Sequence, residues 1–348
     1  MLRGILTHLR SDLAVDLGTA NTLVSVVGEG LVLDEPSVVA VDQRTGRILS
    51  GGCAVGRLAQ QMLGRTGDAI AVVRPLRNGV ITDFELCEAM LHYFLRKAQR
   101  PALRLRPRVL VGVPGGITPV EKRAVFGSTL RAGARQVLLV SQAKAAAIGA
   151  GLPIAEPVAS MVCDVGGGTT EVAVTSLSDV VSGQSIPVGG DAMDRAVADY
   201  LRRHHNLRIG LPTAEKLRIA AGSAWPLEIE DVEEVRGTDG VSGLPRRATV
   251  TSEEVREALL EPLEAILDAV RATLDGCGPE LAADLVDSGM VLCGGGAQLR
   301  GLDRYLAEHT GLPVRTADDP MAAVARGALI CLEHLEAWHP TLESSDDL

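Results

Sequence analysis

Two stretches of the chain decide its fold: Asp16–Thr22, which reads DLGTANT, and Asp164–Glu171, which reads DVGGGTTE. Each stretch follows a short apolar run, at residues 13–15 and 161–163, that predicts a buried strand. Each is followed by an alternating run that predicts the antiparallel partner of that strand. The sequence therefore predicts two strand–turn–strand hairpins that share one glycine-containing turn pattern.

A hairpin of this kind is suited to holding a phosphate group. Its glycines let the backbone turn sharply and approach a ligand closely. Successive N–H groups of the turn form an anion-binding concavity, to which threonine hydroxyls add donors. Asp16 and Asp164, which begin the two stretches, are predicted to hold a divalent cation through water. One such hairpin would be weak evidence, but two in matching contexts predict a grip on one polyphosphate from both sides.

The composition limits the class of protein. The 348 residues are enough for two domains, and with 46% hydrophobic but only 2% aromatic residues the core must consist of Ala, Val, Leu and Ile. The net charge of −10 argues against general nucleic-acid binding. The six cysteines include no CxxC pair, which predicts reduced thiols in a cytoplasmic protein and no structural metal. No run of 18 apolar residues predicts a membrane-spanning helix.

Further patterns complete an α/β order of elements. Val109–Pro114 predicts a buried strand, and Thr118–Glu121 (TPVE) predicts a helix start, with a cap residue, a proline and a glutamate three positions on. Met290–Leu299 (MVLCGGGAQL) predicts a strand, a triple-glycine turn and a helix through Leu306, whose amino terminus can meet a nucleotide. Because this order of elements repeats in the second half, we expect two mixed sheets flanked by helices.

Taken together, these motifs resemble the MreB family, the bacterial actins within the superfamily of actins, sugar kinases and large heat-shock chaperones. The resemblance extends from about Ser11 to Glu336, and its most specific segments are DLGTANT and GGDAMD at Gly189–Asp194. The other matching segments are Glu35–Val39 (EPSVV), Arg74–Ile81 (RPLRNGVI), Gly112–Thr118 (GVPGGIT), Asp164–Glu171 and Gly294–Leu302 (GGGAQLRGL).

The resemblance implies an actin-like ATPase fold of the α/β class. Two ribonuclease-H-like domains with mixed five-stranded sheets would surround a cleft for ATP and Mg2+, and each would carry a small subdomain. The implied division is a membrane-binding segment at 1–10, domain IA at 11–34, 71–147 and 318–338, subdomain IB at 35–70, domain IIA at 148–184 and 250–317, subdomain IIB at 185–249, and a disordered tail at 339–348.

The resemblance also implies the site residues. The first turn would line the β- and γ-phosphates, the second turn would oppose it, and the third glycine cluster would close over the base. Glu215 and Arg218, three residues apart on one helix side, would face the adenosine. Asp16 and Asp164 would lie near the metal and its waters, and with Gln142 they are the expected catalytic positions. The implied nucleotide contacts are Gly18, Thr19, Ala20, Asn21, Gly166, Gly167, Gly168, Thr169, Glu215, Lys216, Leu217, Arg218, Gly294, Gly295, Gly296 and Ala297.

Two positions depart from the family pattern. The family carries Glu-Glu-Pro-Met where this chain has Ser141–Lys144 (SQAK), and the second Glu, which orients the attacking water, is replaced by Gln142. An amide can position water but cannot act as a base, which predicts a slow ATPase, unless the substitution has no effect on the rate. The family's KIEIG reads RIAAG at Arg218–Gly222. The loss of an acidic side chain at Ala220 either alters the nucleotide-facing helix or lies on the solvent face.

The first ten residues predict a membrane contact. Apolar residues recur at helical spacing, with Arg3 and Arg10 off the stripe, and they are Leu2, Ile5, Leu6 and Leu9. Ten residues are too few for a stable helix in water, so the segment needs a surface, either a bilayer or the protein's own. Some members of the family use such an extension as an anchor, which favours the bilayer. Leu103 and Leu105 form a second candidate contact.

The sequence therefore predicts an ATP-dependent protein that assembles with itself into filaments and determines cell shape. On this interpretation it lies in the cytoplasm on the inner face of the cytoplasmic membrane and organises cell-wall synthesis with rod-shape membrane proteins, without binding nucleic acid. One alternative is a small-molecule kinase of the same superfamily, although no motif suggests its catalytic Asp or substrate pocket. Another is an ATP-binding adaptor that barely polymerises. A chaperone would need a peptide-binding domain after residue 340 and is not expected.

Overall fold

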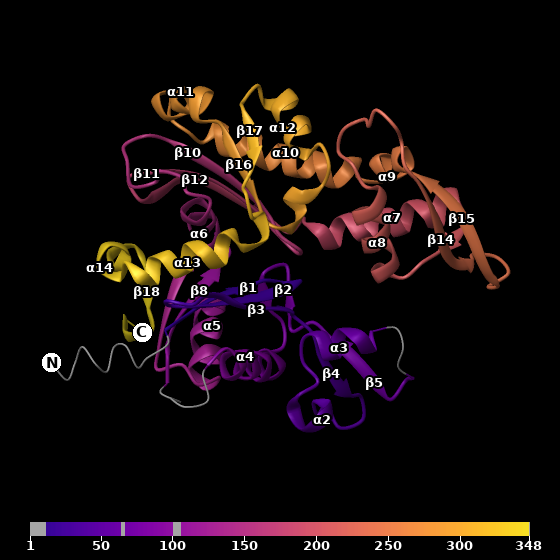
Figure 1. The fold of residues 1–348 in the computed structure, drawn as a ribbon, viewed down its shortest axis with the longest axis horizontal. Coiled ribbons are helices and arrows are strands. Elements are labelled where there is room, and N and C mark those ends of the chain that lie inside the picture. Colours follow the sequence, from indigo (N-terminus) through magenta and orange to yellow (C-terminus); the bar gives the residue numbers. More distant parts are fainter. Residues whose placement is uncertain (1–11, 64–66, 100–105, 348) are drawn as a thin grey trace. The chain divides into compact units, whose positions relative to one another are not determined.

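The computed structural model describes residues 12–63, 67–99 and 106–347. The chain forms two compact units, one that contains the residues up to Ala155 and from Met321 onward, and one that is Glu156–Pro320. Figure 1 shows the elements of both units. The chain thus passes between the units at 155/156 and 320/321, compared with the expected domain boundaries at 147/148 and 317/318.

The first unit is built on a six-stranded mixed sheet in the order β18-β9-β8-β1-β2-β3. Its strands are β1 (Leu13–Leu17), β2 (Asn21–Val26), β3 (Gly30–Pro36), β8 (Arg108–Val113), β9 (Gln136–Ser141) and β18 (Glu343–Ser344). Strand β1 pairs antiparallel with β2, as the hairpin pattern predicts, and parallel with β8.

Four helices pack against this sheet. They are α4 (Phe84–Ala98), α5 (Pro119–Arg131), α6 (Gln142–Gly149) and α13 (Ala323–Glu333). Helix α13 packs against α6 and against β1, β2 and β8, whereas α4 contacts β2 and β3, and α5 contacts β9. The expected helix start at Thr118 is confirmed, because its side chain accepts a hydrogen bond from the backbone N–H of Glu121 while the Glu121 carboxylate accepts one from the N–H of Thr118.

A small part of the first unit has its own sheet and core. Strands β4 (Val39–Asp42) and β5 (Ile70–Val73) pair antiparallel, beside the short helices α2 (Leu49–Gly52) and α3 (Arg57–Met62). Its buried residues are Val38, Ala40, Ala54 and Ala59. The two-stranded ribbon of β6 (Leu76–Arg77) and β7 (Val80–Ile81) follows.

The second unit is built on a five-stranded sheet in the order β12-β11-β10-β16-β17, together with a three-stranded sheet, β13-β14-β15. The strands are β10 (Ser160–Val165), β11 (Thr170–Ser176), β12 (Asp179–Ile186), β13 (Leu207–Arg208), β14 (Val232–Asp239), β15 (Pro245–Thr251), β16 (Met290–Cys293) and β17 (Val314–Thr316). The helices are α7 (Gly190–His204), α8 (Leu211–Ala221), α9 (Ser252–Ala258), α10 (Leu260–Asp275), α11 (Pro279–Ser288) and α12 (Leu302–Thr310). Leu, Val, Ala and Ile side chains make up most of its core, as the composition predicts.

Two expectations about the elements are wrong. The sequence predicts a disordered tail at 339–348, but after α14 (Leu335–Trp338) residues 339–347 form two short 3-10 turns and β18, which pairs with β9 and adds a sixth strand to the first sheet. An ion pair of 2.5 Å between Lys122 and Glu343 holds this strand in place. The third glycine cluster does not continue as one helix through Leu306, because a 3-10 turn, η1 (Gly295–Gln298), precedes α12.

Candidate functional site

The turn of the first hairpin is braced from outside by Ser37. The Ser37 hydroxyl donates to the carbonyl oxygen of Gly18 at 2.7 Å, and the Ser37 N–H donates to that of Ala20 at 2.8 Å. The Thr22 and Ser37 hydroxyls also share a hydrogen bond of 2.8 Å. A Cβ atom on Gly18 would lie 2.5 Å from the backbone oxygen of Asn21, so no side chain fits there. The turn is therefore held in one conformation without a ligand.

Two side chains of this turn have partners within the first unit. The Thr19 hydroxyl accepts from the backbone N–H of Gly79 at 2.9 Å, and the Asn21 amide donates to Asp34 at 3.1 Å. A hydroxyl that accepts one hydrogen bond can still donate its own hydrogen. Thr19 therefore keeps a donor for a phosphate oxygen, whereas the Asn21 side chain serves to fix the turn.

Asp16 and Gln142 meet beside the first turn. Asp16 lies on β1, and Gln142 is the first residue of α6, where its side-chain amide donates to Asp16 Oδ1 at 3.2 Å. Loss of hydration raises the pKa of Asp16 to about 6, while the hydrogen bond from Gln142 opposes this shift. The structure thus brings together two of the three expected catalytic residues.

The turn of the second hairpin is braced by a helix. The Gly166 N–H closes the turn on the Thr169 carbonyl at 2.8 Å. At the amino terminus of α7, the N–H groups of Gly190 and Asp191 donate to the carbonyls of Gly166 and Gly167, at 3.0 and 2.7 Å. Because these carbonyls accept hydrogen bonds from α7, the conformation of the turn is fixed by the protein itself.

Asp164 and the third glycine cluster lie against each other in the second unit. Asp164 is the fifth residue of β10 and is buried. Gly294 directly follows the parallel neighbour β16 and has a φ of +81°, and a Cβ there would lie 2.5 Å from Asp164 Oδ1. Only glycine combines this backbone conformation with so close an approach. In the 3-10 turn that follows, Gly296 and Ala297 are buried while Gly295 is exposed.

The expected adenosine helix is present as α8. Glu215 and Lys216 are exposed on it, while the side chain of Leu217 lies in the hydrophobic core. Arg218 forms an ion pair of 2.7 Å with Asp194 of α7, and both side chains are nearly buried. Burial raises the pKa of Asp194, against the opposing effect of Arg218. This pair ties α8 to the helix that braces the second turn.

The departure at Ala220 lies on the exposed face of α8. The carbonyl oxygen of Ala220 accepts from the guanidinium of Arg300 at 3.3 Å, and the Gly222 carbonyl accepts from it at 3.0 Å. Arg300 also pairs with Asp231 at 2.6 Å. Arg300 follows the third glycine cluster, so it joins the carboxyl end of α8 to that cluster.

The expected site residues thus form one group within each unit. Asp16, Gln142 and the turn at 18–21 belong to the first unit. Asp164, the turn at 166–169, the glycine cluster at 294–297 and α8 belong to the second unit. The motifs EPSVV, RPLRNGVI and GGDAMD include the bracing residues, but sequence reasoning gave these residues no chemical role; they are Ser37, Gly79, Gly190, Asp191 and Asp194.

The expected membrane contacts Leu2, Ile5, Leu6 and Leu9, and the second candidates Leu103 and Leu105, lie outside the described residues. Among the residues that are described, none of the helices has both the length and the apolar character needed to cross a membrane.

Comparison with known proteins identifies the family. The family model described as "MreB/Mbl protein" matches residues 10–340. The chain is 50% identical to the cell shape-determining protein MreB of Escherichia coli K12 over 338 residues, which are 97% of each chain. It is 44% identical to the cell shape-determining protein Mbl of Bacillus subtilis over 325 residues, covering 93% of this chain and 96% of that one.

Solved structures agree with this family assignment. The structure of MreB 5 of Spiroplasma citri bound to AMPPNP superposes with a TM-score of 0.89 at 35% identity, covering 95% of this chain and 98% of that one. A MamK double helical filament shares the fold with a TM-score of 0.78 at 23% identity, covering 93% and 99%. The fold is therefore the actin-like fold, and the chain belongs to the MreB/Mbl family.

Proposed function

We propose that this chain is a nucleotide-dependent, actin-like filament protein that determines cell shape by organising cell-wall synthesis. One observation carries the proposal: the chain is 50% identical to a cell shape-determining protein over 97% of both chains. The alignment covers nearly all of both proteins. Self-assembly into filaments, and contact with cell-wall synthesis proteins, belong to this proposal.

The bound nucleotide is proposed to be ATP with Mg2+. One relative, MreB5 of Spiroplasma citri, was solved with AMPPNP and with ADP, and this chain has two pre-shaped turns whose N–H groups suit phosphates. Asp16 and Asp164 offer carboxylate oxygens, the ligand type that Mg2+ prefers. A cation near Asp16 would also offset the loss of hydration that raises its pKa. When bound, Mg2+ would neutralise phosphate charge, while Thr19 and the turns orient the nucleotide.

Nucleotide binding is tested by thermal unfolding with and without ATP and Mg2+. Asp16→Ala removes a carboxylate from the metal position, and Gly167→Val blocks the approach of a phosphate to the second turn. Both variants are expected to lose the nucleotide-induced rise in Tm, whereas a control at the exposed Asp68, Asp68→Ala, keeps it. A full rise in Tm in both site variants would rule out these turns as the nucleotide site.

Filament formation is tested by electron microscopy of the purified protein with ATP and anionic lipid. The proposal predicts ATP-dependent filaments. Tight ATP binding without filaments would favour the adaptor alternative, and transfer of the terminal phosphate to a sugar would favour the kinase alternative.

Hydrolysis is expected to be slow, and Gln142→Glu is expected to increase phosphate release from filaments. The substitution places a carboxylate where the amide now lies 3.2 Å from Asp16, so that it can accept a proton from the attacking water. Two adjacent carboxylates repel each other, so the nucleotide-free variant should have a lower Tm. The readout is phosphate release under polymerising conditions, with Gln142→Ala as the comparison. If Gln142→Ala hydrolyses ATP as fast as the parent, residue 142 does not position water.

Membrane association through residues 1–10 remains a prediction. The stripe of Leu2, Ile5, Leu6 and Leu9 offers a few side chains, each worth about 1.5–3 kcal/mol when fully buried, before the cost of ordering. A monomer should therefore bind weakly, and a filament with many copies should bind firmly. Deleting residues 1–10 is expected to release filaments from anionic liposomes without affecting nucleotide binding. Unchanged co-sedimentation of the truncated filaments would refute this anchor.

A further inference from the structure

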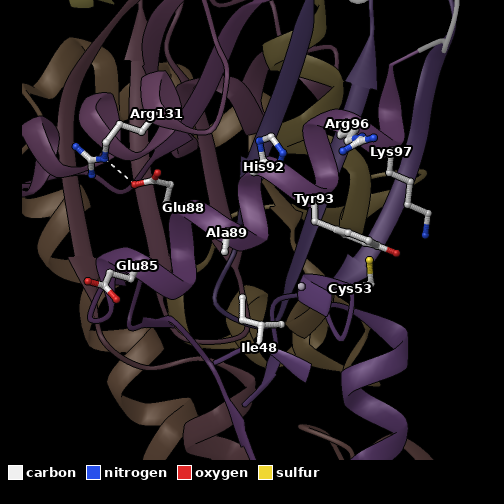
Figure 2. A pocket seen from close by; sticks show the side chains of 11 residues that line it. Ile48, Cys53, Glu85, Glu88, Ala89, His92, Tyr93, Arg96, Lys97 and Arg131 are labelled. Atoms are coloured by element: carbon white, nitrogen blue, oxygen red, sulfur yellow. Dashed lines mark hydrogen bonds and ion pairs between the residues drawn. The ribbon is translucent and has the colours of Figure 1, made fainter. Parts of the chain in front are cut away.

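A groove in the first unit plays no part in the proposed nucleotide chemistry. It lies along α4, beside the small part that contains α2, and has a volume of about 870 Å3. Figure 2 shows its lining, which includes Ile48, Cys53, Ala89, His92, Tyr93 and Arg96. Its volume is within the usual range for ligand pockets. No residue of the first phosphate turn lines this groove, which we call the α4 groove.

The floor of the α4 groove consists of apolar and small side chains. The apolar part is lined by Ile48, Ala89 and the ring of Tyr93, and the small residues Gly52 and Cys53 lie beside them. The Tyr93 ring is held edge-on to Phe94, with 5.9 Å between the ring centroids. Because small side chains let a backbone come close, the floor can receive an apolar side chain from another protein segment.

The rim of the groove is mainly basic. Three cationic side chains line it, together with the imidazole of His92 and the acidic Glu85 and Glu88, and they are Arg96, Lys97 and Arg131. Glu88 is already paired with Arg131 at 2.6 Å. This basic rim stands out in a chain that has 44 acidic and 34 basic residues.

Arg96, beside His92, is the cation of the rim that is open to a new partner. They lie one helical turn apart on α4, and both are exposed. The backbone oxygen of Ala132 lies 2.9 Å from His92 Nδ1 and can only accept, so Nδ1 carries the hydrogen and Nε2 of the neutral ring is an acceptor. Within the described ranges, Arg96 has no carboxylate partner.

We propose that the α4 groove docks an acidic amphipathic segment of a partner protein. An apolar side chain of that segment would fill the floor, and its carboxylates would meet Arg96. Charge complementarity supports this occupant. The chain's own acidic tail is engaged elsewhere, since Glu343 pairs with Lys122 and Asp346 accepts from Gln136 at 2.7 Å. The first ten residues contain Arg3 and Arg10 but no acidic residue, so their charge does not match the rim.

The walls of the groove are ordered before a partner binds. Lys97 is held by Glu35 at 2.6 Å, and the same ammonium lies 5.8 Å from the centroid of the Tyr93 ring. Together with the Arg131–Glu88 and His92–Ala132 contacts, this leaves Arg96 as the main side chain to be ordered on binding. Such preorganisation lowers the entropy cost of association.

Cys53 provides a direct readout of occupancy. It lines the groove and is exposed, whereas four of the other five cysteines are buried and Cys277 in the second unit is only partly exposed. The probe is a synthetic peptide of three Glu-Glu-Leu-Leu repeats. It is expected to slow alkylation of Cys53 by iodoacetamide, measured by mass spectrometry, without changing the alkylation rate of Cys277.

The basic rim is tested with matched variants of the full chain. Arg96→Glu is expected to raise the Kd of the peptide at least about tenfold, a change of about 1.4 kcal/mol in binding free energy. Arg123→Glu makes the same charge change at an exposed arginine of α5 outside the groove and should leave the Kd within about twofold. Ala89→Trp, which fills the floor, should also abolish protection of Cys53. Nucleotide-induced stabilisation should persist in all three variants.

Several results would overturn the proposal. One is an unprotected Cys53 at saturating peptide. Another is an equal loss of affinity in Arg96→Glu and Arg123→Glu, which would indicate only general charge attraction. A third is equal binding of a peptide with glutamine in place of each glutamate. Protection of Cys53 by inorganic phosphate or by phosphatidylglycerol vesicles alone would mean that the groove is an anion site, not a docking site for a protein segment.

Discussion

Replacing Gly327 by alanine is expected to destabilise the first unit by about 3 kcal/mol, because overpacking a close helix contact forces the backbone to move. A Cβ on Gly327 would lie 1.8 Å from the carbonyl oxygen of Ala145, and a Cβ on Gly149 would lie 1.9 Å from that of Ala323. Helices α6 and α13 therefore cross with their backbones in contact, and each glycine makes room for the other helix. Urea unfolding measures the loss.

Gly127 of α5 is the matched control. A Cβ there would meet only the end of the Arg131 side chain, at 3.1 Å, and that side chain can move aside. Gly127→Ala should therefore be neutral, or stabilising by up to about 1 kcal/mol, because alanine favours a helix over glycine. If Gly327→Ala and Gly127→Ala unfold at the same urea concentration, the close crossing of α6 and α13 is wrong.

The crossing of α6 and α13 also bears on function. Helix α6 begins at Gln142, whose amide reaches Asp16. Pushing α6 away from α13 would lengthen this hydrogen bond. We therefore expect any folded fraction of Gly327→Ala to show altered phosphate release, in the same direction as Gln142→Ala.

The hairpins and the helix start at Thr118 could be predicted from sequence because their signals are local. Alternating strands, glycine turns and a capping box each involve residues only a few positions apart. The residues that brace the turns could not be predicted in this way. Gly79 meets Thr19 across 60 positions and Arg218 meets Asp194 across 24, and no periodic pattern links such pairs.

The tail and the contact between helices α6 and α13 also depend on residues distant in sequence, so they could not be predicted either. The acidic composition of residues 339–348 predicted disorder, but β18 is stabilised by pairing with β9 and by Lys122, both distant in sequence. In the sequence alone, Gly149 and Gly327 are residues that disfavour a helix. Only the packing of α6 against α13 shows that both are needed for the close contact. The exposed position of Ala220 was one of two alternatives that the sequence left open.

Substituting Asp16 by asparagine is expected to stabilise the protein at neutral pH when nucleotide and metal are absent. Loss of hydration raises the pKa of this carboxyl from 3.8 to about 6 in the folded chain. One pKa unit corresponds to about 1.4 kcal/mol. The ionised carboxylate therefore costs the folded state up to about 3 kcal/mol, and less to the extent that residual exposure screens it. Asparagine has no charge to desolvate, and its Oδ1 can still accept from Gln142.

The sign of the pH dependence follows from linkage. Between about pH 4 and 6 the folded parent keeps a proton on Asp16 that the unfolded chain releases, so the stability of the parent falls as the pH rises. The gain from Asp16→Asn should thus be small below pH 4 and largest above pH 6. Urea unfolding at several pH values with a chelator measures it, and Asp68→Asn, at an exposed site, controls for net charge. An equal gain at every pH would contradict a raised pKa at Asp16.

The same variant should lose cation-dependent nucleotide binding, so that stability and function change in opposite directions. A carboxylate that destabilises the nucleotide-free protein is retained where its charge is needed to bind a ligand. A cation placed beside Asp16 would favour the ionised form and would offset the cost of removing that carboxylate from water. Adding Mg2+ with nucleotide should therefore stabilise the parent more than Asp16→Asn, and more strongly above pH 6 than at pH 5. If both proteins gain equally at both pH values, Asp16 does not bind the cation.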